Sequence, residues 1–165
     1  MKAKRIVTKI GDIFSVKIDN DLRKFFQLIA YDLTQLNSDV IRAFKNEYPI
    51  TDTLGLSEIV SGEIEFYAHC VTKLGVKLGY WEKIGNINDV GKTNHILFRS
   101  SGDYGNPAIK ISKKWWVWKI NEEQRWVGKL EGENRKAEIG SVMSPDSIVY
   151  RMKTCRNDFF YPDFE

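Results

Sequence analysis

Short stretches in which apolar and polar residues alternate recur along this chain of 165 residues. In the stretch 10–18, phenylalanine, valine and isoleucine alternate with serine and lysine, which predicts a half-buried β-strand. The polar turn at 19–21 and the more apolar run 24–31 predict a second strand, paired with the first in a hairpin. The β-branched and aromatic residues of 40–44 predict a third strand.

The clearest alternation lies in the stretch 63–70, which we expect to form a strand with one buried and one exposed face. The first set of side chains is apolar and is predicted to face inward: Ile64, Phe66, Ala68 and Cys70. The second set is polar or amphipathic and is predicted to face outward: Glu63, Glu65, Tyr67 and His69.

The tryptophan-rich stretch 115–120 and the stretch 125–130 flank a short polar turn and predict a second hairpin, since aromatic cross-strand pairs stabilise paired strands. The run 95–98 predicts another short strand, and 51–62 predicts a short helix. Glycines punctuate the stretch 75–85, which favours turns or bulges there and argues against a regular helix.

A second helix is predicted to begin at Ser144 and to end near Lys153. Serine is a good helix cap, Pro145 lacks the amide hydrogen that this position leaves unused, and Asp146 suits the positive end of the helix dipole. The aromatic tail 158–165 is predicted to pack on the domain or on a partner.

Many strands with one or two short helices, and no regular strand–helix alternation, predict a mainly β, β-rich α+β fold. We expect an antiparallel sheet curled into a barrel or sandwich, and a single β-rich domain that spans residues 1–165. No apolar run approaches the roughly 18 residues of a membrane span, and no signal-peptide core is evident. These features predict a cytoplasmic protein without a membrane partner.

The candidate chemistry is sparse. Cys70 and Cys155 lack the spacing of a zinc site, so no metal and no cofactor is predicted. Nucleophile-elbow, zinc-protease and phosphate-loop motifs are absent, so we assign no catalytic residue. His69 and His95 are candidate bases or ligands, but an ordinary surface or hydrogen-bonded role is favoured for both. The pair Glu63 and Glu65 is expected on one strand face, where solvation is favoured over acid–base chemistry or cation binding.

Four tryptophans crowd the second hairpin, and alternation places them on both of its sides, so we expect some indole to be exposed. Core and rim packing is the simpler interpretation, and an interaction surface is the sharper one, since Trp, Tyr and Arg dominate binding hot spots. The residues proposed for partner binding come from this hairpin and from the stretch 63–70: Trp115, Trp118, Trp126, Glu63, Glu65, Tyr67 and His69.

Three stretches, Lys9–Ile18, Phe25–Ala30 and Leu78–Gly85, resemble the immunity-26 class of bacterial polymorphic-toxin immunity proteins. The similarity covers the N-terminal two thirds of the chain better than the remainder. It implies a cytoplasmic inhibitor that protects a bacterium by binding a protein toxin and occluding it. Some relatives in that class carry the label of a small phosphotriesterase.

The leading hypothesis is therefore an immunity-type binding protein whose partner is a toxin. The first alternative is a small metal-dependent phosphoester hydrolase that uses His69, His95 and nearby carboxylates. The second is a nucleic-acid-binding module that uses Lys113, Lys114 and the tryptophans. The formal net charge of only +3 and the dispersed basic residues make nucleic acid an unlikely partner.

Overall fold

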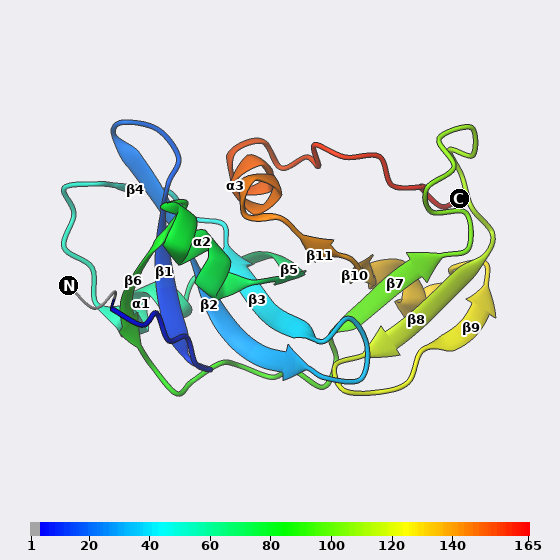
Figure 1. Cartoon of the computed structure of the whole chain (residues 1–165), viewed down its shortest axis with the longest axis horizontal. Coiled ribbons are helices and arrows are strands. Elements are labelled where there is room, and N and C mark those ends of the chain that lie inside the picture. The colour runs from blue at the N-terminus through cyan, green and yellow to red at the C-terminus, as the bar shows by residue number, and fades with distance from the viewer. Residues whose placement is uncertain (1–3) are drawn as a thin grey trace.

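The computed structural model describes residues 4–165 and contains two β-sheets that lie next to one another along the longest axis of the molecule (Figure 1). The larger sheet has the order β11-β5-β3-β2-β1-β6, with β4 paired to β2, and the smaller has the order β10-β7-β8-β9. Two pairs, β11 with β5 and β10 with β7, are parallel, and the other pairs are antiparallel. The sheets do not close into a barrel. The predicted β-rich α+β class is confirmed.

The strands of the larger sheet are β1 (Asp12–Lys17), β2 (Leu22–Asp32), β3 (Ser38–Phe44), β4 (Tyr48–Pro49), β5 (Ile64–Cys70), β6 (Glu82–Asn86) and β11 (Val142–Met143). Those of the smaller sheet are β7 (Leu97–Ser101), β8 (Trp115–Lys119), β9 (Arg125–Gly128) and β10 (Glu138–Ile139). The helices are α1 (Leu56–Val60), α2 (Thr72–Leu78), α3 (Pro145–Thr154) and a 3₁₀ turn at Gly132–Lys136. Among residues 4–165, no helix is long and apolar enough to cross a bilayer.

Both predicted hairpins are confirmed. β1 pairs with β2, and the carboxylate of Asp19 accepts hydrogen bonds from the backbone amides of Asp21 and Leu22, at 2.7 and 2.8 Å, which fixes the turn between them. β8 pairs with β9, and Trp116 lies opposite Trp126 with the two rings edge to face. The strand expected at 95–98 begins at Leu97 instead and runs to Ser101.

The larger sheet is covered on both faces, so the prediction that the stretches 10–18 and 63–70 each have an exposed face was wrong, whereas the more buried strand predicted at 24–31 is confirmed. On one face, Phe14, Phe26 and Phe66 pack against Trp81 and the inner side of α3. On the other face lie one cluster beneath α1 and a second cluster shared with the smaller sheet. As a result Ser15, a predicted outward residue of β1, is only 6% exposed.

The helix α2 was not expected, and its glycines explain why. Gly75 lies inside the helix because a Cβ there would stand 2.0 Å from the ring of Trp81. Gly79 ends the helix in the left-handed conformation, with φ of 80°. The Trp81 indole nitrogen donates to the carbonyl oxygen of Thr72 at 2.9 Å and ties the following turn back to the start of the helix.

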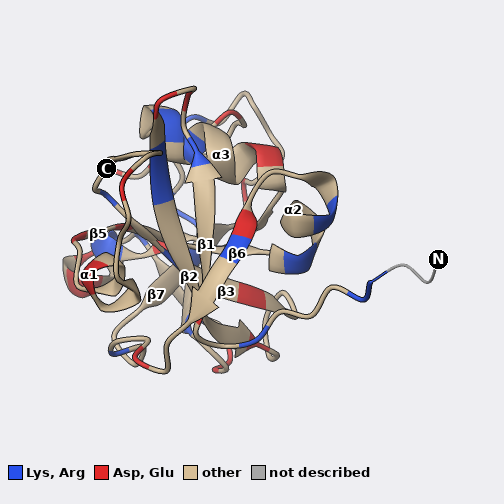
Figure 2. Ribbon diagram, turned by 90° about the vertical axis from the view of Figure 1, so that its left-hand side faces the viewer, with Lys and Arg blue, Asp and Glu red and all other residues tan. Residues whose placement is uncertain are grey.

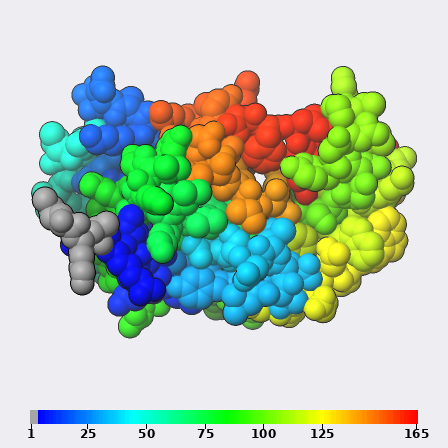
Figure 3. Space-filling model, viewed as in Figure 1, coloured from blue at the N-terminus to red at the C-terminus, as the bar shows by residue number. Residues whose placement is uncertain are grey.

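The two segments predicted near the C-terminus are confirmed. α3 follows Ser144, has Pro145 in its first turn, and buries Ile148 and Met152 against the larger sheet. The tail packs on the smaller sheet, where the backbone of Asp163 exchanges hydrogen bonds with Lys110 and Ser112. The space-filling view shows this red segment reaching across to the loop that precedes β8 (Figure 3). The first predicted helix, at 51–62, is also present as α1.

Candidate functional site

The tryptophan hairpin is mostly core. Trp115 and Trp118 are buried on opposite sides of β8, so the prediction that they contact a partner is not supported by their positions. Trp118 packs against the larger sheet, and Trp115 packs beneath the C-terminal tail. Trp126, which is 54% exposed, is the one residue of the proposed hairpin set that lies at the surface.

Glu63 and Glu65 do not share a face, in contrast to the prediction. The pairing of β3 with β5 shifts between Ala43 and Phe44, which leaves Glu65 as an extra residue and breaks the alternation. Glu65 turns toward the buried Lys24, whose ammonium nitrogen lies 2.9 Å from its carboxylate. Glu63 remains at the surface, where it pairs with Lys45 at 3.5 Å.

His69 was expected to face outward and is instead fully buried between the two sheets. Its Nε2 lies 2.8 Å from the carboxylate of Asp32, which also accepts a hydrogen bond from the indole nitrogen of Trp118 at 3.1 Å. Burial lowers the pKa of His69, and the contact with Asp32 offsets this only in part. Burial alone would raise the pKa of Asp32, but its hydrogen bonds outweigh that effect and lower it. A neutral imidazole that donates a hydrogen bond to an ionised carboxylate fits the lowered pKa of His69 and the lowered pKa of Asp32. This arrangement is structural.

His95 is exposed and contacts the ring of the half-buried Tyr67 edge to face, with ring centroids 6.2 Å apart. It therefore does not share the Asp32 contact of His69. Within residues 4–165, no group of three or more His, Cys, Asp or Glu side chains is arranged to hold a metal ion. The hydrolase alternative thus gains no support from the geometry.

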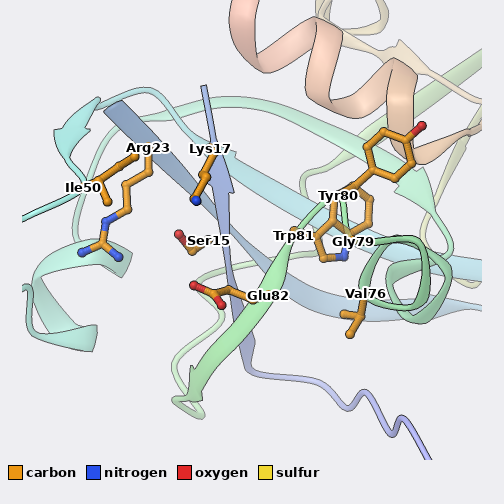
Figure 4. A pocket seen from close by; sticks show the side chains of 9 residues that line it. All are labelled: Ser15, Lys17, Arg23, Ile50, Val76, Gly79, Tyr80, Trp81 and Glu82. Carbon is orange, nitrogen blue, oxygen red and sulfur yellow. The ribbon is translucent and has the colours of Figure 1, made fainter. Parts of the chain in front are cut away.

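A cavity of about 490 Å³ opens beside the C-terminal end of β1 (Figure 4). One wall comes from the β1–β2 hairpin and β4, and the other from the C-terminal end of α2 and the start of β6. We call it the β1 pocket, and its lining residues are Ser15, Lys17, Arg23, Ile50, Val76, Gly79, Tyr80, Trp81 and Glu82.

The β1 pocket exists because β6 covers only part of the edge of β1. The pairing of these strands ends at Ser15 opposite Glu82, and beyond that point β1 has a partner only on its β2 side. The chain preceding β6 turns away through Tyr80 and Trp81, because Trp81 is drawn under α2. Trp81 thus shapes the pocket while lying almost completely in the core.

Two cations stand opposite one another in this pocket. Lys17 and Arg23 are direct cross-strand neighbours in the β1–β2 register, a position in which like charges repel. In the part of the chain that the structure describes, neither forms an ion pair with a carboxylate. The Arg23 Nη2 donates to the carbonyl oxygen of Asp52 at 2.6 Å, and its Nε is buried without a hydrogen-bond partner.

An exposed apolar stripe lies on the outer side of α2 and meets the pocket only at Tyr80, the one member of the stripe that lines the cavity. Val71, Leu74 and Leu78 are spaced by three and four residues, which places them on one side of the helix, and Tyr80 follows in the next turn. Leu78 is 57% exposed. We call these four residues the α2 stripe. In the ribbon of Figure 2, the positions of basic residues are coloured blue on α2 and on the neighbouring β6.

Sequence reasoning missed the α2 stripe because the large apolar residues of this helix face solvent, which is the opposite of the usual arrangement. Its inner positions hold the small residues Thr72 and Gly75, and its leucines point outward. The helical spacing of Val71, Leu74 and Leu78 was the signal that could have located it.

No family model, curated protein or solved structure matches this chain. The candidate site therefore rests on its own geometry: an exposed apolar stripe on α2 that meets, at Tyr80, a cavity lined by two cations without an ion pair and by Glu82.

Proposed function

We propose that this protein is an immunity-type binding protein that neutralises a bacterial toxin by covering its active site, and that it binds through the α2 stripe. The observation that carries the proposal is the set of four exposed apolar side chains on and next to α2, of which Tyr80 also lines the β1 pocket. Single exposed apolar residues are common, but a contiguous group beside a concave site is typical of interaction surfaces. The resemblance to the immunity-26 class supports the partner, since its third stretch, Leu78–Gly85, runs through this surface.

The charges around the stripe favour a protein partner with an acidic rim. Lys73 and Lys77 lie on the exposed part of α2, and neither forms an ion pair within residues 4–165. Apolar residues surrounded by exposed charge resemble the core and rim of a protein interface. The lysines would raise the rate of association with a partner of opposite potential.

The α2 stripe is also held firmly. The Trp81 ring lies against Gly75 in the middle of the helix, and its indole nitrogen donates a hydrogen bond to the carbonyl oxygen of Thr72 at the start of the helix. Because an ordered surface loses little conformational freedom on binding, such a platform suits an inhibitor that must bind tightly.

Co-expression with the toxin encoded beside the gene tests the proposal. The wild-type protein is expected to restore growth, and the double variant Leu74→Ser/Leu78→Ser is expected to lose protection while its circular dichroism spectrum is unchanged. Trp126→Ser, which removes an exposed aromatic residue from the other sheet, is the matched control and should still protect.

Two outcomes would count against this assignment. If the wild-type protein neither restores growth nor binds the purified toxin in calorimetry, the inhibitor function is wrong. If Trp126→Ser abolishes protection and the leucine double variant retains it, the contact lies on the tryptophan hairpin and not on the α2 stripe.

A further inference from the structure

We infer that the β1 pocket receives one acidic side chain of the partner protein, whose carboxylate binds between Lys17 and Arg23. This inference rests on the proposed function, because it assigns the part of the partner that anchors beside the α2 stripe. The pocket is a receptor for a single residue, and the stripe supplies the surrounding apolar contact.

The case for an anion begins with the strand register. Lys17 and Arg23 are held opposite one another by the β1–β2 hairpin, so their repulsion is built into the fold. A negative group between them would remove that repulsion and gain hydrogen bonds to charged donors, which are stronger than those between neutral groups. The buried Arg23 Nε, which has no partner, is a polar group that the fold alone leaves unsatisfied.

The close-up view shows how the donors are arranged (Figure 4). The Lys17 ammonium group points toward Ser15, whereas the Arg23 side chain extends from the neighbouring strand along the side of the pocket where Ile50 lies. The side chain of Ser15 faces the same cavity and can donate a hydrogen bond. The three side chains thus come from one rigid hairpin, which keeps their spacing independent of the partner.

The opposite wall favours a carboxylate over a phosphate. Glu82 lines the pocket, and its negative charge opposes the entry of a dianion more strongly than that of a monoanion. Val76 and Gly79 belong to the C-terminal end of α2, which carries the partial negative charge of the helix.

The pocket also has the size and the apolar wall for a side chain with its neighbours. Its volume of about 490 Å³ lies within the range of about 300–1,000 Å³ that is usual for ligand sites. Tyr80 is half exposed at the rim, and Val76 lies beside it, so an aromatic residue adjacent to the acidic one can pack there.

Two dipeptides that differ only in charge test the inference without a toxin. Nuclear magnetic resonance titrations of the ¹⁵N-labelled protein would use N-acetyl-Glu-Phe-amide and N-acetyl-Gln-Phe-amide. We expect the acidic peptide to shift the amide resonances of Ser15, Lys17 and Arg23 with a dissociation constant on the order of millimolar, as befits so small a ligand. The neutral peptide is expected to bind about fivefold to tenfold more weakly. Equal binding of both peptides, or shifts confined to other regions, would overturn the inference.

Charge-neutral variants locate the site. Lys17→Gln and Arg23→Gln should each weaken binding of the acidic peptide severalfold, and Glu82→Gln should strengthen it. Lys119→Gln removes an exposed lysine of β8 and is expected to change nothing. If Lys17→Gln binds the acidic peptide as the wild type does, the pocket is not the receptor. Because Arg23 also bonds to the backbone of Asp52, Lys17→Gln is the decisive variant.

The two proposals can fail separately. Selective binding of the acidic peptide without protection against the toxin would leave the carboxylate site standing and remove the inhibitor function. The opposite result is protection that depends on Leu74 and Leu78 but is unchanged in Lys17→Gln, together with equal binding of the two peptides. That result would keep the inhibitor function and remove the carboxylate site.

Discussion

The tryptophan hairpin β8–β9 and the segment from α2 to β6 are both rich in large apolar residues, yet they use them in opposite ways. In the hairpin, Trp115 and Trp118 are buried on opposite sides of one strand. In α2, Leu74 and Leu78 are exposed and the buried positions hold small residues. Large apolar side chains in a sequence therefore do not report which region serves as a surface.

The difference arises from how many sides of each element are covered. Strand β8 of the hairpin is enclosed by the larger sheet on one side and by the aromatic tail on the other, where Tyr161 and Phe164 pack against Trp115, whereas β9 leaves Trp126 exposed. α2 has cover on its inner side only, where Gly75 admits the ring of Trp81. An element with one covered side leaves its other side for solvent or for a partner.

The largest expected change in the free energy of unfolding is the difference between removing a core tryptophan and removing a surface tryptophan. Trp115→Ala is expected to lower the free energy of unfolding by about 3–5 kcal/mol, because it removes a fully buried ring and leaves a cavity. Trp126→Ala should cost less than about 1 kcal/mol, since its main contact is the edge-to-face pair with Trp116. Urea denaturation measures both, and similar losses for the two variants would contradict the assignment of the hairpin to the core.

The second prediction concerns the covered side of α2. Helix propensity alone would make Gly75→Ala stabilising by up to about 1 kcal/mol. The added Cβ would stand 2.0 Å from the Trp81 ring, so we expect overpacking to prevail and to destabilise the fold by about 1–3 kcal/mol. Gly102→Ala, whose Cβ would make only ordinary contacts with Lys114, is the control. A stabilised Gly75→Ala protein would show that Trp81 moves freely beneath the helix.

The sequence was sufficient for features that depend on local patterns. The hairpin at 19–21 followed from turn chemistry, and the helix at Pro145–Thr154 followed from its proline and its apolar face, although the Ser144 side chain makes no capping hydrogen bond to the helix backbone. The burial of Cys70 was also predicted correctly, and of the two sites expected for the aromatic tail, the domain or a partner, the tail packs on the domain. For the turn and the helix the local residues decide the outcome, so a single sequence contains the information.

Features that depend on distant segments could not be predicted in this way. His69 is buried because the smaller sheet covers its face of β5, and alternation within β5 does not contain that fact. Glu65 changes face because of a bulge opposite Ala43 and Phe44. The β1 pocket depends on where β6 stops pairing, which the packing of Trp81 under α2 determines.

The buried His69 gives the third prediction, a pH dependence of stability. Burial lowers the pKa of His69 in the folded state, whereas an unfolded histidine titrates near 6.5. As the pH falls below that value, the unfolded chain takes up a proton that the folded protein does not, so the free energy of unfolding falls. The slope from this residue reaches at most about 1.4 kcal/mol per pH unit.

Denaturation at pH values from 7.5 to 5.5 in His69→Gln and His95→Gln isolates this contribution. His69→Gln should be less stable at pH 7.5, because it disturbs the contact with Asp32, but its stability should depend less on pH. His95→Gln removes an exposed ring and should keep the wild-type slope. Equal slopes in the wild type and in His69→Gln would show that folding does not lower the pKa of His69, and a steeper fall in the variant would show that the buried imidazole is charged when folded.

The smallest change in the free energy of unfolding is expected for a residue of the α2 stripe, and it tests whether the fold needs this stripe. Leu78→Gln should change the free energy of unfolding by no more than about 0.5 kcal/mol, as is usual for an exposed side chain without structural contacts. A loss above about 2 kcal/mol, comparable with a core truncation, would mean that the leucine supports the fold. If stability is unchanged while toxin protection is lost, the leucine is required for binding alone, and the uncovered side of α2 is where the partner binds.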